Sequence, residues 1–318
     1  MNSTPDIDPL MPDSIPLRPF GATGIQVSAI GFGGYHLGLI TSRREAVRLT
    51  QAAIDAGITF LDNAWEYHDG ESESRMGEAL AGRRDRVFLM TKVCTHGRDA
   101  KVARRQLEES LRRLRTDYLD LWQVHECVYD SDPDLHFARG GVIEAMDRAK
   151  REGKVRFVGF TGHKSPAIHL AMLARDYPFD SCQLPLNCFD ATFRSFERDV
   201  LPELARRRIA PIGMKSLGGT GEPAKRRAVS ARDALRYAMS LPVATTVSGI
   251  DSEKVLKQNL QVARGFRPFS AEEMHGLRDK ASRLAADGRF ELYKTTASFE
   301  GPIGRATHGY PGLDTMTS

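Results

Sequence analysis

The chain has 318 residues, of which 41% are hydrophobic and 27% are charged, so it is long enough to bury a large core. Its net charge of +4 comes from 45 basic and 41 acidic residues, and this near balance argues against a nucleic-acid-binding surface. No apolar run approaches the roughly 20 residues that a membrane-spanning helix needs, and no secretory signal begins the sequence, so we expect a cytoplasmic protein without a membrane partner.

The N-terminal region predicts a tail followed by a small hairpin. Residues 1–16 are expected to form a disordered or loosely attached tail, and residues 17–318 a single domain. The segment 18–28, RPFGATGIQVS, has glycines between two short extended runs and predicts a β-hairpin before the first strand of the main sheet.

Eight short apolar runs along the chain predict β-strands, and each is followed by a segment with helical periodicity. Val47, Thr50 and Ile54, for example, fall on one face of a helix. From the second strand onward the strands start about 30 residues apart, which is the length of a βα unit. The predicted strands are residues 27–30, 58–61, 87–90, 118–124, 155–160, 181–184, 210–214 and 244–247.

Eight βα units predict an α/β fold of the (β/α)8 TIM-barrel type, although the length would also suit two medium domains. The hairpin would then cover the bottom of the barrel. Long polar connections at 33–42, 126–140 and 217–229 follow strands, on the side where barrels of this type build active sites. The chain beyond Gly265 has one more helical pattern and a Gly- and Pro-rich end, which we expect to fold over the barrel mouth.

The cysteines give no indication of a metal site or a redox pair. Their spacing forms neither a CxxC pair nor a zinc-binding pattern with histidines. We expect all four to be reduced and buried, as free cysteines of cytosolic proteins usually are. These residues are Cys94, Cys127, Cys182 and Cys188.

Four polar residues follow three consecutive predicted strands. Asp62 and Tyr67 come after the second strand, Lys92 after the third and His125 after the fourth. Each alone has an ordinary structural explanation, such as a satisfied core histidine or a lysine whose stem packs along the sheet. Because the parallel strands of a barrel end at one rim, we expect the four side chains to meet there.

Such a group could deliver a proton to a carbonyl compound. A phenol has a pKa near 10, and the charge of Lys92 would stabilise the anion of Tyr67 without being needed for the fold. Asp62 would keep Lys92 protonated, and His125 could donate to the carbonyl oxygen while Tyr67 delivers the proton. The four residues provide no hydride, so a hydride-carrying cofactor is expected.

Over roughly residues 17–264 the chain resembles the aldo-keto reductase superfamily. The matching stretches are GITFLDNAWEYHDGESE, TKV, DYLDLWQVH, GKVRFVGFTGH, CQLPLN, GMKSLGG and SGIDSEKVLKQNL. The Asp-Tyr-Lys-His tetrad of that superfamily falls on Asp62, Tyr67, Lys92 and His125. The resemblance implies a (β/α)8 barrel and NAD(P)H-dependent reduction of an aldehyde or ketone, or the reverse reaction, with Tyr67 as general acid or base.

The resemblance also implies a cofactor site, with NADP(H) favoured over NAD(H). Thr161 and Gln183 would bind the nicotinamide, and backbone N–H groups after the seventh strand would bind the pyrophosphate. The complete implied set is Gly34, Tyr35, Asp62, Thr161, Gly162, Gln183, Met214, Lys215, Ser216, Leu217, Gly218, Gly219, Arg227, Gly249, Ile250, Asp251, Lys254, Val255, Gln258 and Asn259.

Several positions depart from the pattern of the superfamily. Asn63 stands where Thr is common, and Thr161 and Gly162 stand where a Ser-Asn pair is common. Asp251 and Val255 occupy places where many members have Ser and Arg. A carboxylate at position 251 repels a 2′-phosphate and suits a free ribose hydroxyl, so NAD(H) stays open, whereas Lys254 or the basic run 225–227 could offset it.

The substrate is expected to be a small carbonyl or alcohol compound bound by aromatic and imidazole groups, without a choice among sugars, aryl aldehydes and ketones. The expected substrate-binding residues are Tyr35, His36, Trp65, His96 and His125. The reaction direction is not indicated, and a monomer and a small homo-oligomer are both compatible with the sequence.

Two other functions remain as alternatives. The first is a cofactor-binding regulatory or sensor subunit on the same fold, which an intact tetrad and the lack of a long docking extension disfavour. The second is a doubly wound dehydrogenase, suggested by GFGG at 31–34, which lacks the third glycine of the dinucleotide-binding motif.

Overall fold

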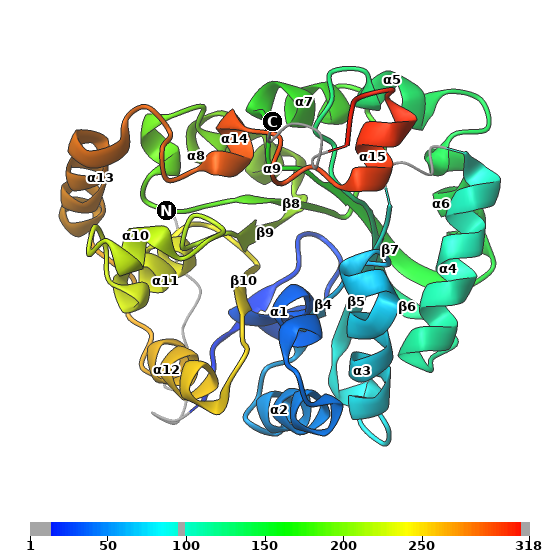
Figure 1. The fold of residues 1–318 in the computed structure, drawn as a ribbon, viewed down its shortest axis with the longest axis horizontal. Coiled ribbons are helices and arrows are strands. Elements are labelled where there is room, and N and C mark those ends of the chain that lie inside the picture. Colours follow the sequence, from blue (N-terminus) through cyan, green and yellow to red (C-terminus); the bar gives the residue numbers. More distant parts are fainter. Residues whose placement is uncertain (1–13, 95–98, 313–318) are drawn as a thin grey trace, which may run out of the picture.

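The computed structural model describes residues 14–94 and 99–312, so most of the predicted N-terminal tail lies outside the described residues. Eight parallel strands close into a barrel in the order β10-β3-β4-β5-β6-β7-β8-β9, with helices outside it (Figure 1), which confirms the predicted (β/α)8 fold. The barrel strands are β3 (Ile30–Gly33), β4 (Phe60–Asp62), β5 (Phe88–Val93), β6 (Leu119–Val124), β7 (Val155–Thr161), β8 (Ser181–Pro185), β9 (Ala210–Met214) and β10 (Thr245–Gly249).

The prediction of residues 27–30 as the first barrel strand was wrong by three residues. Two of its four residues, Val27 and Ser28, belong to the hairpin, and the barrel strand is instead β3, which contains Gly31 and Gly33 of GFGG. A Cβ at Gly31 would lie 2.9 Å from a ring carbon of Phe60, and one at Gly33 would lie 3.0 Å from the carbonyl of Ser248. These glycines therefore allow neighbouring strands to pack closely, and they do not form a dinucleotide-binding turn.

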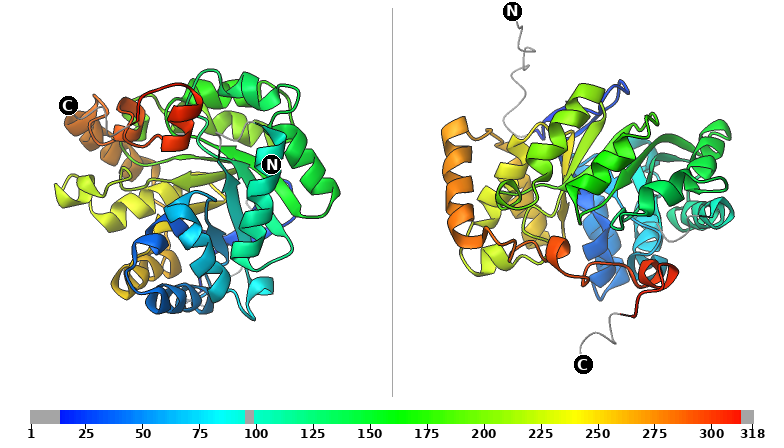
Figure 2. Two further views of the ribbon diagram at one scale, coloured as in Figure 1. Left: turned by 45° about the vertical axis from the view of Figure 1, so that its right-hand side comes forward. Right: turned by 90° about the horizontal axis from the view of Figure 1, so that it is seen from above.

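The N-terminal hairpin consists of β1 (Leu17–Pro19) and β2 (Gln26–Ser28), which pair antiparallel. Phe20, at its turn, is fully buried, and its ring centroid lies 4.7 Å from that of Phe88 inside the barrel. Arg18 donates to the carbonyls of Val243 and Met239, just before β10. The hairpin thus covers the bottom of the barrel, opposite the C-terminal tail (Figure 2), as the sequence predicts.

The outer helices bury one apolar face each against the barrel. In α4, Ala103, Leu107, Leu111 and Leu114 are buried at spacings of three to four residues, and Asp99 caps the first turn. No helix among residues 14–94 and 99–312 is long and apolar enough to cross a membrane. The outer helices are α2 (Arg43–Asp55), α3 (Glu71–Ala79), α4 (Ala100–Leu114), α6 (Val142–Arg151), α7 (Pro166–Leu173), α9 (Leu201–Arg207), α11 (Ala231–Ser240) and α12 (Glu253–Arg264).

Short helical segments interrupt several of the connections between these elements. Those on the predicted long polar loops are α1 (Gly34–Leu39), α5 (Asp132–Phe137) and α10 (Glu222–Lys225). The other short segments are η1 (Tyr67–Gly70), η2 (Arg84–Arg86), η3 (Asp190–Thr192) and α8 (Phe196–Asp199).

The C-terminal chain crosses the barrel mouth after α13 (Ala271–Ala285), through α14 (Leu292–Thr295) and α15 (Pro302–Thr307) (Figure 1). Lys294 is fully buried, and its ammonium lies 2.6 Å from an oxygen of Asp190 and 2.9 Å from one of Glu291. Further along, the backbone N–H of Gly301 donates at 3.0 Å to Glu126, the second residue after β6. The tail is therefore fastened to the barrel by buried charges, which confirms the predicted extension over the mouth.

Candidate active site

The four residues of the predicted tetrad meet at the mouth of the barrel. Asp62 ends β4, Tyr67 begins η1, Lys92 lies in β5 and His125 directly follows β6. The ammonium of Lys92 donates to Asp62 Oδ1 at 2.5 Å, to the Asn63 carbonyl at 2.7 Å and to Tyr67 Oη at 3.4 Å. Lys92 thus connects the carboxylate to the phenol, as the sequence predicts.

The backbone after β4 turns sharply, and this turn brings Tyr67 back over the strand ends. The N–H of Trp65 donates to the Lys92 carbonyl at 3.1 Å, which ties the loop to β5. His68, Asp69 and Gly70 then take positive φ angles of 51°, 55° and 85°. Such left-handed residues reverse the chain before α3, so the phenol ring faces inward instead of following the helix away from the mouth.

The pKa of Tyr67 is raised, although the sequence led us to expect that the charge of Lys92 would stabilise its anion. Burial raises it well above 10, and the negative charges of Asp62, Glu66 and Glu126 raise it further. The Lys92 contact of 3.4 Å is long, because the ammonium is held closer to Asp62 and Asn63. The phenol therefore stays protonated near neutral pH, and the ammonium can act on the phenolate only as a proton leaves.

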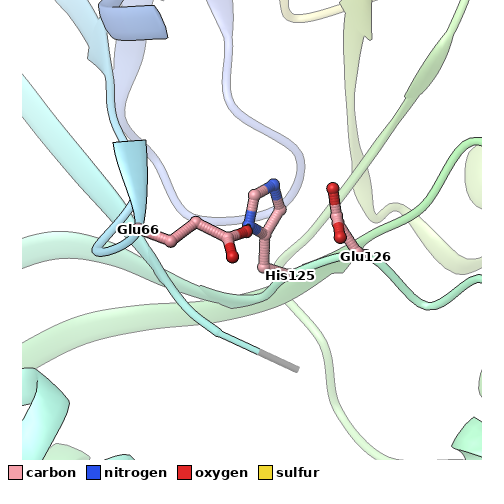
Figure 3. A group of neighbouring side chains, drawn as sticks. All are labelled: Glu66, His125 and Glu126. Atoms are coloured by element: carbon pink, nitrogen blue, oxygen red, sulfur yellow. The ribbon is translucent and has the colours of Figure 1, made fainter. Parts of the chain in front are cut away.

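Two carboxylates that the sequence analysis did not single out lie beside His125. Glu66 Oε1 is 2.6 Å from His125 Nδ1, and Glu66 Oε2 accepts a hydrogen bond from the Cys94 thiol at 3.0 Å. Glu126 lies on the other side of the imidazole (Figure 3), and burial followed by the charge of Glu66 raises its pKa well above the usual range. Glu126 could have been noticed in the sequence, because it directly follows His125 at a predicted strand end.

Glu66, His125 and Glu126 each offer an oxygen or nitrogen within 4.8 Å of the others, a spacing compatible with a metal ion. Protein groups already contact the carboxylates, however. Both oxygens of Glu66 face protein donors, and Glu126 Oε2 accepts from Gly301 N–H. The two carboxylates are therefore engaged by Cys94, His125 and Gly301.

The ends of β7 and β8 provide groups that fit a nicotinamide carboxamide. Gln183 is 2% exposed, and its Oε1 has no hydrogen-bond partner within the described chain. His163, after β7, is 4% exposed and has a similarly unpartnered Nε2, which the sequence analysis missed. A Cβ at Gly162 would lie 2.3 Å from the Cys127 carbonyl, so this position has no room for the Asn that the superfamily often has. Buried polar atoms of this kind need a partner, which a bound ligand can supply.

The turn after β9 contains the residues predicted to follow the pyrophosphate, from Met214 to Gly219. Lys215, Gly218 and Gly219 take positive φ angles of 56°, 68° and 79°, and Ser216 is buried between them. The half-buried Lys215 ammonium lies 5.4 Å and 5.1 Å from the ring centroids of Tyr293 and Phe299 in the tail. Burial lowers its pKa to about 8, so a basic group adjoins the expected phosphate path.

The residues predicted for the adenosine lie around the end of β10 and on α12. At Gly249 a Cβ would overlap the His36 ring at 2.2 Å, so the glycine lets α1 approach the strand end. Ile250 is buried, and Asn259 Nδ2 donates to Ser248 at 3.0 Å. The side chains expected nearest a 2′-phosphate or the adenine are more accessible to solvent. Asp251, Lys254 and Arg227 are exposed, and Val255 and Gln258 are half-buried.

Of the predicted substrate-binding residues, Tyr35 and His125 have rings that pack against Tyr67, and the ring of His36 packs against Tyr35. His96 lies outside the described residues. Tyr35 is 51% exposed, and its ring packs edge-on against Tyr67 at 5.4 Å between centroids. The Trp65 indole donates to Glu109 of α4 at 2.7 Å, which fixes the orientation of its ring. Gly34 lies so close to Asp62 that a Cβ would be 2.6 Å from the Asp62 carbonyl.

Comparison with known proteins gives one family. A model of the aldo/keto reductase family matches residues 29–229. The aldo-keto reductase YhdN of Bacillus subtilis (strain 168) is 31% identical over 210 residues, which cover 61% of this chain and 60% of that protein. The methylglyoxal reductase YeaE of Escherichia coli (strain K12) is 37% identical over 133 residues, or 42% of this chain and 44% of that protein. The matches thus span less than two thirds of these two relatives.

Solved structures match a larger part of the chain. An aldo/keto reductase from Klebsiella pneumoniae, solved in complex with NADP and acetate, has a TM-score of 0.67 and 26% identity. The match covers 84% of this chain and 94% of that one. The similarity therefore extends over most of this chain and nearly all of the Klebsiella pneumoniae protein.

Proposed function

This chain belongs to the aldo/keto reductase family, and from the geometry of its barrel mouth we propose that it reduces an aldehyde or ketone to an alcohol, or catalyses the reverse. The observation that carries the proposal is the position of the Lys92 ammonium, which contacts both Asp62 and Tyr67 Oη. An ion pair buried to this extent beside a phenol is costly to maintain for stability alone. It is consistent with a site built to move a proton.

In this proposal Tyr67 is the general acid. Burial keeps its phenol protonated, and the proton leaves only when a substrate oxygen acquires negative charge and becomes the stronger base. Lys92 then stabilises the phenolate, and the ion pair with Asp62 holds the ammonium beside Oη. His125, whose ring packs edge-on against Tyr67, would donate to the same substrate oxygen. A nicotinamide cofactor, when bound, supplies the hydride.

We propose NADP(H) as the cofactor. The unpartnered oxygen of Gln183 supports a carboxamide donor at the ends of β7 and β8, and the basic Lys215 supports phosphate groups after β9. The Klebsiella pneumoniae relative was solved with NADP, which favours the phosphorylated form. Asp251 is the feature that opposes this choice, because its carboxylate is expected to face the ribose.

Cofactor binding followed by turnover tests the proposal. Titration with NADPH and with NADH, followed by fluorescence, should show saturable binding of at least one of them. Aldehydes and ketones of increasing size are then screened for oxidation of the cofactor that binds. Saturable binding without any turnover would favour the regulatory alternative, and the absence of binding to both cofactors would contradict the proposed function.

Replacing Asp251 by Ser should lower the Kd for NADPH about tenfold and leave the Kd for NADH unchanged or higher. Like charges a few ångströms apart cost on the order of 1 kcal/mol even in water, and 1.4 kcal/mol corresponds to about a decade in Kd. The exposed Asp251 carboxylate accepts a hydrogen bond from Ser252 and has no cation within 4.0 Å among the described side chains. Fluorescence titration of both cofactors measures the effect.

Glu253 provides a matched control, because it is another exposed carboxylate on the same segment and pairs with Arg48. Glu253→Ser should change neither cofactor affinity. A weaker NADPH affinity in Asp251→Ser with NADH unaffected would mean that Asp251 holds a cation on the phosphate. The same affinities as wild type for both cofactors would mean that residue 251 does not reach the ribose.

A further inference from the structure

Glu66 lies outside the tetrad, yet it makes the shortest contact of His125. Its Oε1 is 2.6 Å from Nδ1, and the two side chains are 15% and 9% exposed (Figure 3). At this distance the carboxylate forms an ion pair with a protonated ring, and its charge favours a proton on the nearer nitrogen, Nδ1. The other oxygen of Glu66, Oε2, accepts a hydrogen bond from the thiol of Cys94 at 3.0 Å, which holds the carboxylate beside the ring.

We propose that Glu66 is a positioning residue that holds a proton on Nδ1 of His125 and so decides whether Nε2 can donate to the substrate oxygen. The inference rests on the proposed function, and it concerns a residue next to the tetrad. A neutral imidazole has one N–H group. When that group is the Nδ1–H beside the Glu66 carboxylate, Nε2 presents a lone pair, and only the imidazolium carries a second proton there.

The two protonation states of His125 therefore suit opposite reaction directions. The imidazolium donates from Nε2 to a carbonyl oxygen and supports reduction. The neutral ring accepts a hydrogen bond from the hydroxyl of an alcohol and supports oxidation. Reduction should accordingly be fastest below the pKa of His125 and decline as the pH rises through it, whereas oxidation should increase over the same range.

The charges around the ring make Glu66 the main influence that favours the imidazolium. Burial lowers the pKa of His125, and the carboxylate of Glu66 is the strongest influence that raises it, whereas the charge of Lys92 lowers it. Other groups face this region from each neighbouring strand end: Asp62 and Tyr67 after β4, Lys92 and Cys94 at β5, Glu126 after β6, His163 after β7 and Lys215 after β9.

Glu66→Gln tests the proposal, because it removes the charge and keeps the size of the side chain. The pKa of His125 should fall by about one to two units, the usual effect of losing an adjacent opposite charge. The midpoint of the pH profile for reduction should move to lower pH by the same amount. Nitrogen NMR of histidine-labelled protein reports both the pKa and the tautomer, and a His125→Asn variant identifies the signal among the nine histidines.

Glu109→Gln is the matched control. Glu109 is a nearby carboxylate on α4 that accepts from the Trp65 indole and is not among the charges that act on His125. The control should leave the pKa of His125 as in wild type. A wild-type ring whose neutral form carries its proton on Nε2, or an unchanged His125 pKa in Glu66→Gln, would overturn the proposal.

The titration uses protein without cofactor or substrate, so it separates this inference from the proposed function. If no carbonyl compound is reduced by the wild type, the proposed function fails, and the NMR result still decides what Glu66 does. If turnover is found but Glu66→Gln shifts neither the ring pKa nor the pH profile, the function stands and the role of Glu66 is refuted.

Discussion

Replacing Tyr67 by Phe should lower the kcat for carbonyl reduction by at least ~10²-fold, the scale on which general acid catalysis contributes. The substitution removes the hydroxyl and leaves the ring, which packs against Tyr35 and His125 with centroids 5.4 Å and 5.6 Å away. Lys92 keeps its contacts with Asp62 and Asn63, so the mouth should retain its shape. Cofactor affinity should therefore be nearly unchanged.

Steady-state kinetics with a saturating cofactor and a fluorescence titration of cofactor binding together measure this outcome. Tyr118→Phe is a suitable control, because Tyr118 precedes β6 at the opposite end of the barrel, where its ring lies under the guanidinium of Arg84. That variant should have wild-type kinetics. A Tyr67→Phe enzyme that keeps more than about a third of the wild-type kcat would exclude Tyr67 as the general acid.

Replacing Lys92 by Met should abolish most turnover and also destabilise the fold. Without the ammonium, the phenolate of Tyr67 loses its only cationic neighbour within hydrogen-bond reach among the described residues. The sequence alone suggested that the fold would be spared. The structure leads to a different expectation, because Asp62 is 4% exposed and would be left buried without its partner, which typically costs about 3–5 kcal/mol.

The double variant Lys92→Met/Asp62→Asn separates the two effects. It removes both charges, so the melting temperature should recover much of what Lys92→Met loses, whereas turnover should stay as low. Thermal unfolding and kcat are measured on the single and double variants in parallel. Recovery of activity together with stability would show that Lys92 serves the fold and not the chemistry.

The barrel and the meeting of the tetrad were predictable because both depend on local pattern. Apolar runs about one βα unit apart define parallel strands, and parallel strands end at one rim, so Asp62, Lys92 and His125 had to lie near one another. The bounds of β9 were predicted without error, whereas the first barrel strand was displaced. The glycines of β3 resemble a turn in sequence, and only their contacts with Phe60 and Ser248 show why a strand needs them.

The sequence by itself determined which side chains can do chemistry at this rim, because the residue at each strand end follows from the period of the strands. Only the tertiary structure decided the electrostatics among them. Three carboxylates converge on Tyr67 and raise its pKa, and Glu66 reaches His125 across the mouth from a different loop. Burial and charge interactions depend on distances between segments far apart in the chain, and no local pattern encodes those distances.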